Sequence, residues 1–199
     1  MKILALTLVC LSSAWATSIT LTMDEVPFQT VNGLDVTKGG ITFGFTDTSG
    51  ADYDAADGGQ ETYVQDPSIE GQTAGELLTV NFSLPMYLIS FGMADSTQGT
   101  GFVMASVNFY NGANLLGNQI LDATVSNAFS QGELVYLGNL GQVTSIQITM
   151  NSGSASAFAV DNLYVNTSLP EPSTLFSSFA GIATLSWIAL RRRRSLRQS

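Results

Sequence analysis

Histidine is absent from this chain of 199 residues, and cysteine occurs once, at Cys10. These absences exclude a Ser-His-Asp triad, a Cys-His pair and any zinc site built from histidine or cysteine. Because Cys10 falls in an apolar N-terminal segment, the body of the protein has no disulfide and no thiol chemistry. Oxygen ligands remain, so hard cations such as calcium are the only metals that the composition favours.

Basic residues are almost missing from the middle of the chain. The stretch 17–169 contains 15 acidic residues and a single lysine, Lys38, whereas the whole chain has a net charge of −9. The other basic residues lie at the two ends. A body this anionic should repel nucleic acid and anionic lipid headgroups. Its charge fits either simple solubility or attraction of cations.

The N-terminus, MKILALTLVCLSSAWATS, predicts a signal peptide. A basic residue precedes the apolar run 3–11, which is too short to span a bilayer, and Ala14 and Ala16 form an A-x-A site. We expect signal peptidase to cut after Ala16. A lipoprotein leader is the alternative, because Cys10 follows apolar residues, but Val9 stands where that leader needs a small residue.

The C-terminal region predicts a membrane anchor. Residues 174–190 are uncharged, and 17 residues are at the short end for a transmembrane helix. Four arginines follow and should stay in the cytoplasm under the positive-inside rule. The predicted topology therefore has the domain outside and the tail inside. The stop-transfer residues are Arg191, Arg192, Arg193 and Arg194.

The residues before this helix are more specific. Pro170, Glu171 and Pro172 form a segment that its two prolines keep extended and outside the helix. The order of tripeptide, apolar helix and arginine cluster over residues 169–194 resembles the PEP-CTERM sorting signal, also called the ice-binding-protein C-terminal domain. The resemblance implies that an exosortase-type transpeptidase of a Gram-negative bacterium recognises Pro170-Glu171-Pro172 and cleaves nearby. The protein would be anchored briefly in the inner membrane, then released or attached to the cell surface or matrix.

Residues 17–168 are predicted to form one all-β domain, an antiparallel sandwich, because no segment has a useful helical period. In "VTSIQITM" (143–150) apolar and polar residues alternate, which indicates a half-buried strand. Asn32-Gly33, Asn111-Gly112 and Gly58-Gly59 are turn signals. The expected strands are 19–23, 40–46, 77–84, 86–93, 102–110, 115–121, 133–137, 143–150 and 157–165.

Three segments, "ITLTMDEVPF", "GGITFGF" and "SAFAVDNLYV", resemble exported jelly-roll domains and carbohydrate-binding sandwiches. The resemblance implies that the first and last strands lie side by side. It also implies one structural calcium held by Glu25 and Asp161, with Asp24 as a further ligand. A carboxylate within an apolar strand needs a partner. The alternative is that Asp161 points to solvent or caps a loop.

The segment "DTSGADYDAADGGQE" (47–61) is rich in aspartate. It departs from EF-hand spacing, because Asp57 and Gly58 come one residue late and no glutamate stands at position twelve. A solvated acidic loop or a looser calcium site are the two interpretations. Tyr53 and Tyr63 flank the loop and would be the stacking residues for a sugar, since both tryptophans lie in the targeting segments.

These observations lead to an expected function. We expect an exported, non-catalytic protein of the cell surface or extracellular matrix. The alternative is a carbohydrate-binding jelly-roll module with a structural calcium, which would contact extracellular polysaccharide. A hydrolase is a third hypothesis, because two carboxylates suffice for glycoside hydrolysis. No motif singles out one such pair, so no catalytic residue is predicted.

Overall fold

The computed structural model describes residues 17–55, 61–73, 75–151 and 157–168. The chain divides into two units, Met1–Thr167 and Ser168–Ser199, and all the strands belong to the first. Within the described ranges the regular elements are β-strands. These ranges contain no helix that is long and apolar enough to cross a membrane. The predicted signal peptide (1–16) and sorting signal (169–194) lie outside these ranges.

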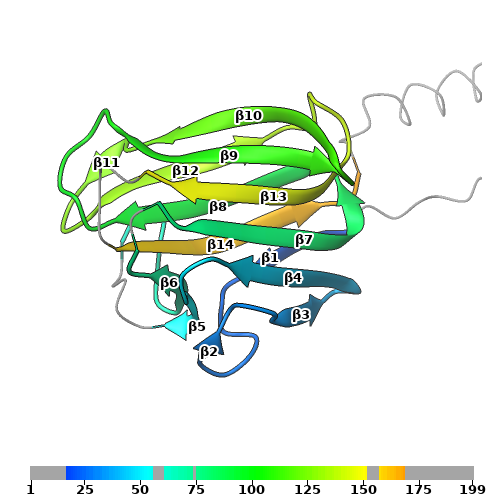
Figure 1. Cartoon of the computed structure of the whole chain (residues 1–199), viewed down its shortest axis with the longest axis horizontal. Helices are drawn as coiled ribbons and strands as arrows, with labels where there is room; N and C mark the ends of the chain where they lie inside the picture. Colours follow the sequence, from blue (N-terminus) through cyan, green and yellow to red (C-terminus); the bar gives the residue numbers. More distant parts are fainter. Residues whose placement is uncertain (1–16, 56–60, 74, 152–156, 169–199) are drawn as a thin grey trace, which may run out of the picture. The chain divides into compact units, whose positions relative to one another are not determined.

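Two antiparallel sheets pack face to face and form a sandwich, as predicted (Figure 1). Sheet A has the strand order β11-β12-β8-β14-β6-β5-β2, and β1 pairs with the part of β14 that β6 leaves free. Its strands are β1 (Ser18–Leu21), β2 (Gln29–Thr30), β5 (Asp52–Ala55), β6 (Ser68–Gly71), β8 (Leu88–Asp95), β11 (Val125–Ser126), β12 (Ser130–Tyr136) and β14 (Phe158–Asn166).

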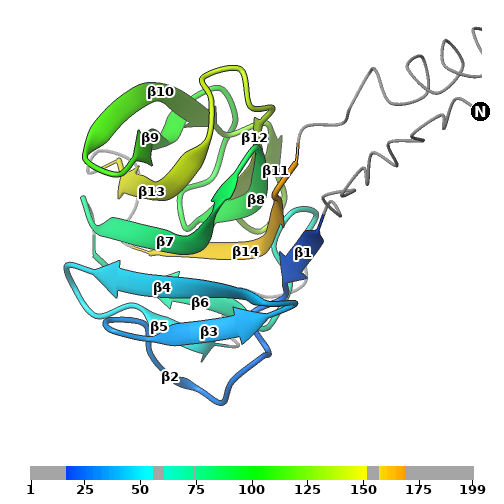
Figure 2. The same cartoon turned by 90° about the vertical axis from the view of Figure 1, so that its right-hand side faces the viewer.

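Sheet B has the order β10-β9-β13-β7-β4-β3 and forms the second layer, which Figure 2 shows from the side. The hairpin between β9 and β10 turns at Gly112, whose φ of 57° lies in the left-handed region that glycine adopts without strain. Its strands are β3 (Asp35–Lys38), β4 (Ile41–Asp47), β7 (Leu77–Met86), β9 (Val103–Asn111), β10 (Asn114–Asp122) and β13 (Val143–Met150).

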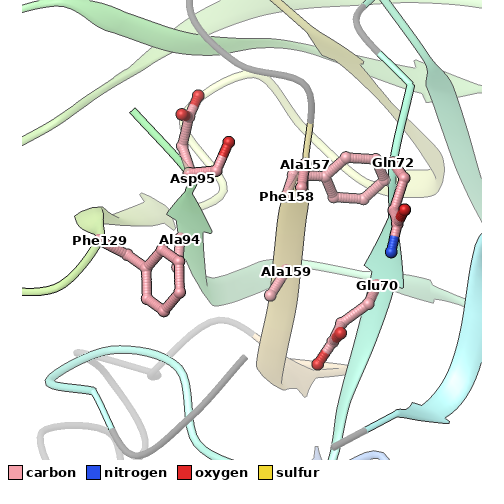
Figure 3. Close-up of a pocket in the computed structure, with 10 residues that line it drawn as sticks. Glu70, Gln72, Ala94, Asp95, Phe129, Ala157, Phe158 and Ala159 are labelled. Carbon is pink, nitrogen blue, oxygen red and sulfur yellow. The ribbon is translucent and has the colours of Figure 1, made fainter. Parts of the chain in front are cut away.

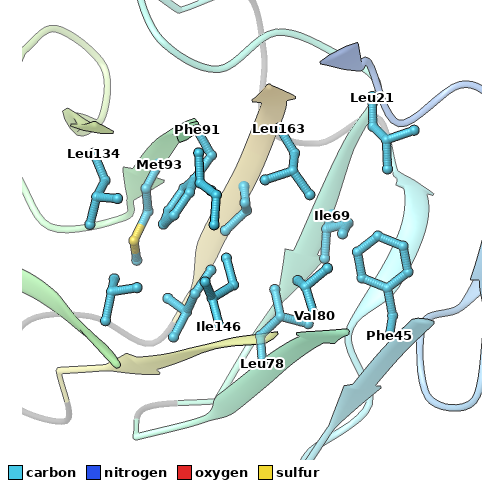
Figure 4. Packing of buried hydrophobic residues seen from close by; sticks show 14 of the residues in the cluster. Leu21, Phe45, Ile69, Leu78, Val80, Phe91, Met93, Leu134, Ile146 and Leu163 are labelled. Atoms are coloured by element: carbon cyan, nitrogen blue, oxygen red, sulfur yellow. The ribbon is translucent and has the colours of Figure 1, made fainter. Parts of the chain in front are cut away.

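The hydrophobic core fills the space between the sheets (Figure 4). Phe91 and Met93 of β8 point toward the inward side chains of sheet B, among them Ile146 and Val80. All four are at most 2% exposed, and burying a side chain of this size stabilises the fold by about 1.5–3 kcal/mol. Because side chains alternate along a strand, these inward residues also fix which residues face outward.

Several sequence predictions are confirmed by the sheets. Strand β13 begins at Val143 and ends at Met150, the predicted bounds. The first and last strands lie side by side, with Leu21 paired to Leu163. Strand β7, predicted as 77–84, extends two residues further to Met86, and β8, predicted as 86–93, is shifted by two residues to Leu88–Asp95.

Five short strands, β2, β3, β5, β6 and β11, were not predicted, because each has only two to four residues. A segment of that length shows at most two alternations, which is too little to distinguish a strand from a loop, as in DYDA of β5. Strand β6 has the sequence SIEG, yet its Ser68 and Ile69 are buried because β6 pairs with both β14 and β5.

Candidate functional site

Glu25, predicted as a calcium ligand, has several hydrogen-bond donors. Its Oε1 accepts hydrogen bonds from Lys38 Nζ at 2.6 Å and from the Thr22 backbone N–H at 3.0 Å. Its Oε2 accepts one from the Tyr53 hydroxyl at 2.6 Å. Burial raises the pKa of Glu25, but the bonds from Lys38, Tyr53 and Thr22 outweigh it and hold the pKa below its usual value. The only lysine of the body therefore serves as the counter-ion of Glu25.

Tyr53 is not a sugar-stacking residue, and that prediction is wrong. The residue is 0% exposed, and its ring packs edge-on against Phe45 with centroids 5.9 Å apart. Burial, together with the bond to Glu25, raises the pKa of its hydroxyl. Tyr63, the second predicted stacking residue, is half-buried, and its role in sugar binding stays a prediction.

Asp161 lies on the outward side of β14 and is only 2% exposed, so the prediction that it needs a partner is confirmed and the solvent-facing alternative is wrong. Its Oδ2 accepts hydrogen bonds from the Gln65 backbone N–H at 3.0 Å and from Asn162 Nδ2 at 2.8 Å. Burial raises the pKa of Asp161 to about 6, assisted by the charges of Glu25 and Asp24. Asp161 therefore binds the segment that precedes β6.

The predicted calcium ligands Asp24, Glu25 and Asp161 are close enough for their charges to interact, as the pKa of Asp161 indicates. They do not converge on one point, however, since no group of three Asp or Glu side chains in the described part of the chain is placed to hold a metal ion. Asp24 Oδ1 instead accepts a hydrogen bond from the Thr22 hydroxyl at 2.7 Å.

The segment 61–67 lies over the outer side of sheet A, and we call the area under it the covered face. A Cβ added to Gly92 of β8 would overlap the Tyr63 carbonyl, so the two backbones are in close contact. Val64, Ala94 and Ala159 form a small hydrophobic cluster at the same place. Sequence reasoning missed this cover, because its contacts join residues far apart in the chain.

A pocket of about 100 Å³ lies beside the covered face, where β8 ends and β14 begins (Figure 3). Phe129, Ala94 and Ala159 form an apolar wall, and Glu70 and Asp95 add carboxylates. Pockets that enclose small ligands usually measure roughly 300–1,000 Å³. This pocket is therefore too small to enclose an oligosaccharide.

The outer side of sheet B has a different character, and we call it the open face. The strand registers place one residue from each of five strands in a single row across the sheet, from β10 to β4. A second row runs beside it through Tyr110, Ser145 and Asn81. The first row consists of Asn118, Asn108, Gln147, Thr79 and Thr46.

Every member of these two rows is uncharged and carries a hydroxyl or an amide. Asn118 Nδ2 donates to Ser106 Oγ at 2.7 Å and to Asn108 Oδ1 at 2.9 Å, which fixes the orientation of the Asn118 amide. Leu115 lies opposite Tyr110, and Ile120 lies opposite Ser106. These two apolar side chains are 57% and 51% exposed, so the polar rows have an apolar border.

Most acidic side chains are gathered elsewhere, although Asp122 is exposed at the end of β10. Asp35 lies at the β3 edge of the open face, with its carboxylate against Gly44. Most of the other acidic residues in the described ranges lie on sheet A or in its loops. They are Asp24, Glu25, Asp52, Asp54, Glu61, Asp66, Glu70, Asp95, Glu133 and Asp161. The alternation in "VTSIQITM" did predict an outward polar row on β13, but its continuation across the sheet depends on registers that a sequence does not specify.

Comparison with known proteins found no matching family model and no curated protein with a matching sequence. Among solved structures, the chain is similar to a family 29 carbohydrate-binding module from Piromyces equi, with 10% identity, 82% of this chain and 98% of that chain covered, and a TM-score of 0.42.

Two further structures are similar at a comparable level. A low-affinity xylan-binding module of family 86 from Roseburia intestinalis has 12% identity, covers 76% of this chain and 94% of its own, and has a TM-score of 0.36. A family 11 module from Clostridium thermocellum has 14% identity, 77% and 98% coverage, and a TM-score of 0.36. At these values the comparison does not identify a ligand for this chain.

Proposed function

We propose that this protein is an exported, non-catalytic carbohydrate-binding protein whose open face on sheet B holds a neutral polysaccharide. Its C-terminal signal would deliver it to the cell surface or the extracellular matrix. The proposal joins the two expectations from the sequence, since a sorted matrix protein needs something in the matrix to bind.

One observation carries the proposal: two adjacent uncharged rows of amides and hydroxyls cross sheet B on an otherwise strongly anionic body. Amide and hydroxyl groups both donate and accept hydrogen bonds, which is what the hydroxyls of a sugar require. Tyr110 and the exposed Leu115 offer apolar surface for the C–H faces of a sugar ring. An acidic polysaccharide would be repelled by the body, so the expected ligand is neutral.

A binding role suits the described residues better than hydrolysis does. A glycosidase needs two carboxyl groups that flank a bond of the substrate. Asp47 and Glu76 are one pair of carboxylates whose charges interact, and Glu76 is only 1% exposed. No substrate reaches that pair without local unfolding.

Sorting is supported by the sequence of residues 169–194 alone. If the exosortase-type signal acts as proposed, the mature protein loses Arg191–Arg194 after cleavage near Pro170-Glu171-Pro172. Mass spectrometry of the protein recovered from the producing cells tests this step. A mature form that still carries the arginines would show that the tail is a permanent anchor.

The binding function is tested by affinity electrophoresis through gels that contain neutral polysaccharides such as xylan, mixed-linkage glucan or mannan. We expect retardation by at least one of them, and we expect Asn108→Ala with Gln147→Ala to abolish it, because the row loses two hydrogen-bonding side chains. Gln29→Ala, on an exposed residue of β2, is the matched control and should bind like the wild type. Retardation that survives the double substitution would refute the open face as the site.

Tyr63 gives a second variant for the same assay. If Tyr63→Ala removes binding while the open-face variants keep it, the sugar is held beside the loop 61–67 instead. Indifference to a broad panel of glycans would favour a matrix protein without a glycan ligand.

A further inference from the structure

Two carboxyl groups, those of Asp47 and Glu76, lie where the chain crosses from β6 of sheet A to β7 of sheet B. Asp47 ends β4, and Glu76 directly precedes β7, the strand that pairs with β4. Glu76 is 1% exposed, although a charged side chain is rarely buried without a partner. The acidic segment 47–61 was noted in the sequence, but Glu76 was not.

Three oxygens of this pair are buried and have no hydrogen-bond partner in the part of the chain that the structure describes. They are Asp47 Oδ1, Glu76 Oε1 and Glu76 Oε2. An unsatisfied buried polar atom is destabilising, and more so when it is charged. Both oxygens of a fully buried glutamate thus lack a hydrogen bond of good geometry, although the Ser49 hydroxyl lies near enough to lower the pKa of Glu76.

The backbone fixes both side chains in this arrangement. Asp47 Oδ2 accepts hydrogen bonds from the backbone N–H groups of Ser49, at 3.1 Å, of Gly50 and of Ala51, at 2.9 Å. Oδ1 is thereby left free on the side of Glu76. The Glu76 carbonyl in turn accepts a hydrogen bond from the Met150 N–H at 2.9 Å.

The absence of a side chain at Gly71 leaves room for the Glu76 carboxylate. A Cβ added to Gly71, the last residue of β6, would lie 2.7 Å from Glu76 Oε2 and would overlap the Phe158 ring. The carboxylate is therefore held between sheet A at Gly71 and sheet B at Asp47. Burial raises the pKa of Glu76, the Ser49 hydroxyl lowers it, and the Asp47 charge raises it further.

We infer that Asp47 and Glu76 bind a calcium ion that links the β6–β7 crossover to the end of β4. Two carboxylates with three free oxygens match the all-oxygen coordination that calcium prefers, with water and backbone carbonyls completing the shell. The ion neutralises two like charges that otherwise repel each other in a buried place. This inference is independent of sugar binding, since the open face lies on the outer side of sheet B.

The test is thermal unfolding of the purified full chain in millimolar calcium and in chelator. We expect calcium to raise the melting temperature by about 5 °C, because an ion that binds only the folded state stabilises that state. In Glu76→Gln and in Asp47→Asn we expect this shift to disappear. Glu76→Gln should also melt higher than the wild type in chelator, because the like-charge repulsion is gone. Glu133→Gln, which changes an exposed glutamate of β12, should keep the full calcium shift.

Bound metal is measured in parallel by atomic emission after dialysis against micromolar calcium. We expect close to one calcium per wild-type chain and a large loss in both pair variants. A calcium shift that persists in Glu76→Gln and vanishes in Asp161→Asn would overturn the inference in favour of the ligands near Asp161. No calcium shift in the wild type would also overturn it and would leave a shared proton as the partner of the pair.

Discussion

The outer sides of the two sheets differ in what covers them. On sheet A, the segment 61–67 contacts the strands so closely that Gly92 has no room for a side chain, and Asp161 binds the segment through Gln65. On sheet B, no described segment passes in front of β9 and β13 in Figure 1, and Asn108 and Gln147 of these strands are half-buried. A sandwich with one covered face and one open face that carries two uncharged rows is suited to holding an extended neutral ligand along those rows.

Matched glycine substitutions give the largest expected effect. In Gly92→Ala the new methyl group overlaps the Tyr63 carbonyl, so the segment 61–67 must shift, and we expect a loss of about 2–4 kcal/mol of unfolding free energy. In Gly44→Ala, on sheet B, the methyl group meets the Asp35 carboxylate at 2.9 Å, which can rotate away, and Asn81 Cβ at 3.8 Å, an ordinary contact. We expect a change of less than about 0.5 kcal/mol there. Denaturant unfolding of both variants checks the difference, and equal losses would show that sheet A is not covered as described.

Removing the carboxylate that holds the cover should have an intermediate effect. Asp161→Ala leaves the Gln65 N–H without its acceptor, and a buried unsatisfied donor costs about 1–3 kcal/mol. Hydrogen exchange should then be faster at residues 63–65 and unchanged along β13. Unchanged exchange at Gln65 would contradict the assignment of Asp161 as the residue that binds this segment.

The charge of Asp161 also predicts a pH dependence. Its folded pKa is raised from 3.8 to about 6, so the folded protein binds the proton more tightly than the unfolded chain does. The stabilisation from this residue is fully present below pH 3.8 and is lost as the pH rises through about 6. In chelator, the unfolding free energy of the wild type should therefore fall relative to Asp161→Asn between pH 4 and 7, as denaturation at each pH will measure. A difference that stays constant across this range would contradict the raised pKa.

The smallest stability effect is expected on the open face. Gln147→Glu places a charge at the centre of the uncharged row, but the side chain is only half-buried, so the unfolding free energy should change by less than about 0.5 kcal/mol. Binding of a neutral glycan should weaken nonetheless, because a carboxylate loses the donor that the amide supplied. A large loss of stability would show that Gln147 has a structural role.

The sequence predicted the sandwich because its long strands alternate clearly, as Val143–Met150 does. It also indicated that Asp161 needs a partner, since a carboxylate in an apolar strand is costly. It could not identify that partner, because Gln65 is 96 residues away in the chain. Tyr53 was misjudged for a related reason, since it stands between two aspartates and its contacts are with Glu25 of the β1–β2 loop and Phe45 of β4. The open face likewise depends on the register of five strands.

The most direct test of the central claim is to map a bound neutral oligosaccharide by amide chemical-shift perturbation in the ¹⁵N-labelled protein. We predict that the perturbed amides lie on β9, β13 and β7, around Asn108, Gln147 and Thr79, and that β8 and β14 remain unaffected. Perturbations confined to the segment 61–67 and the pocket at Phe129 would contradict this account and would place the ligand on sheet A.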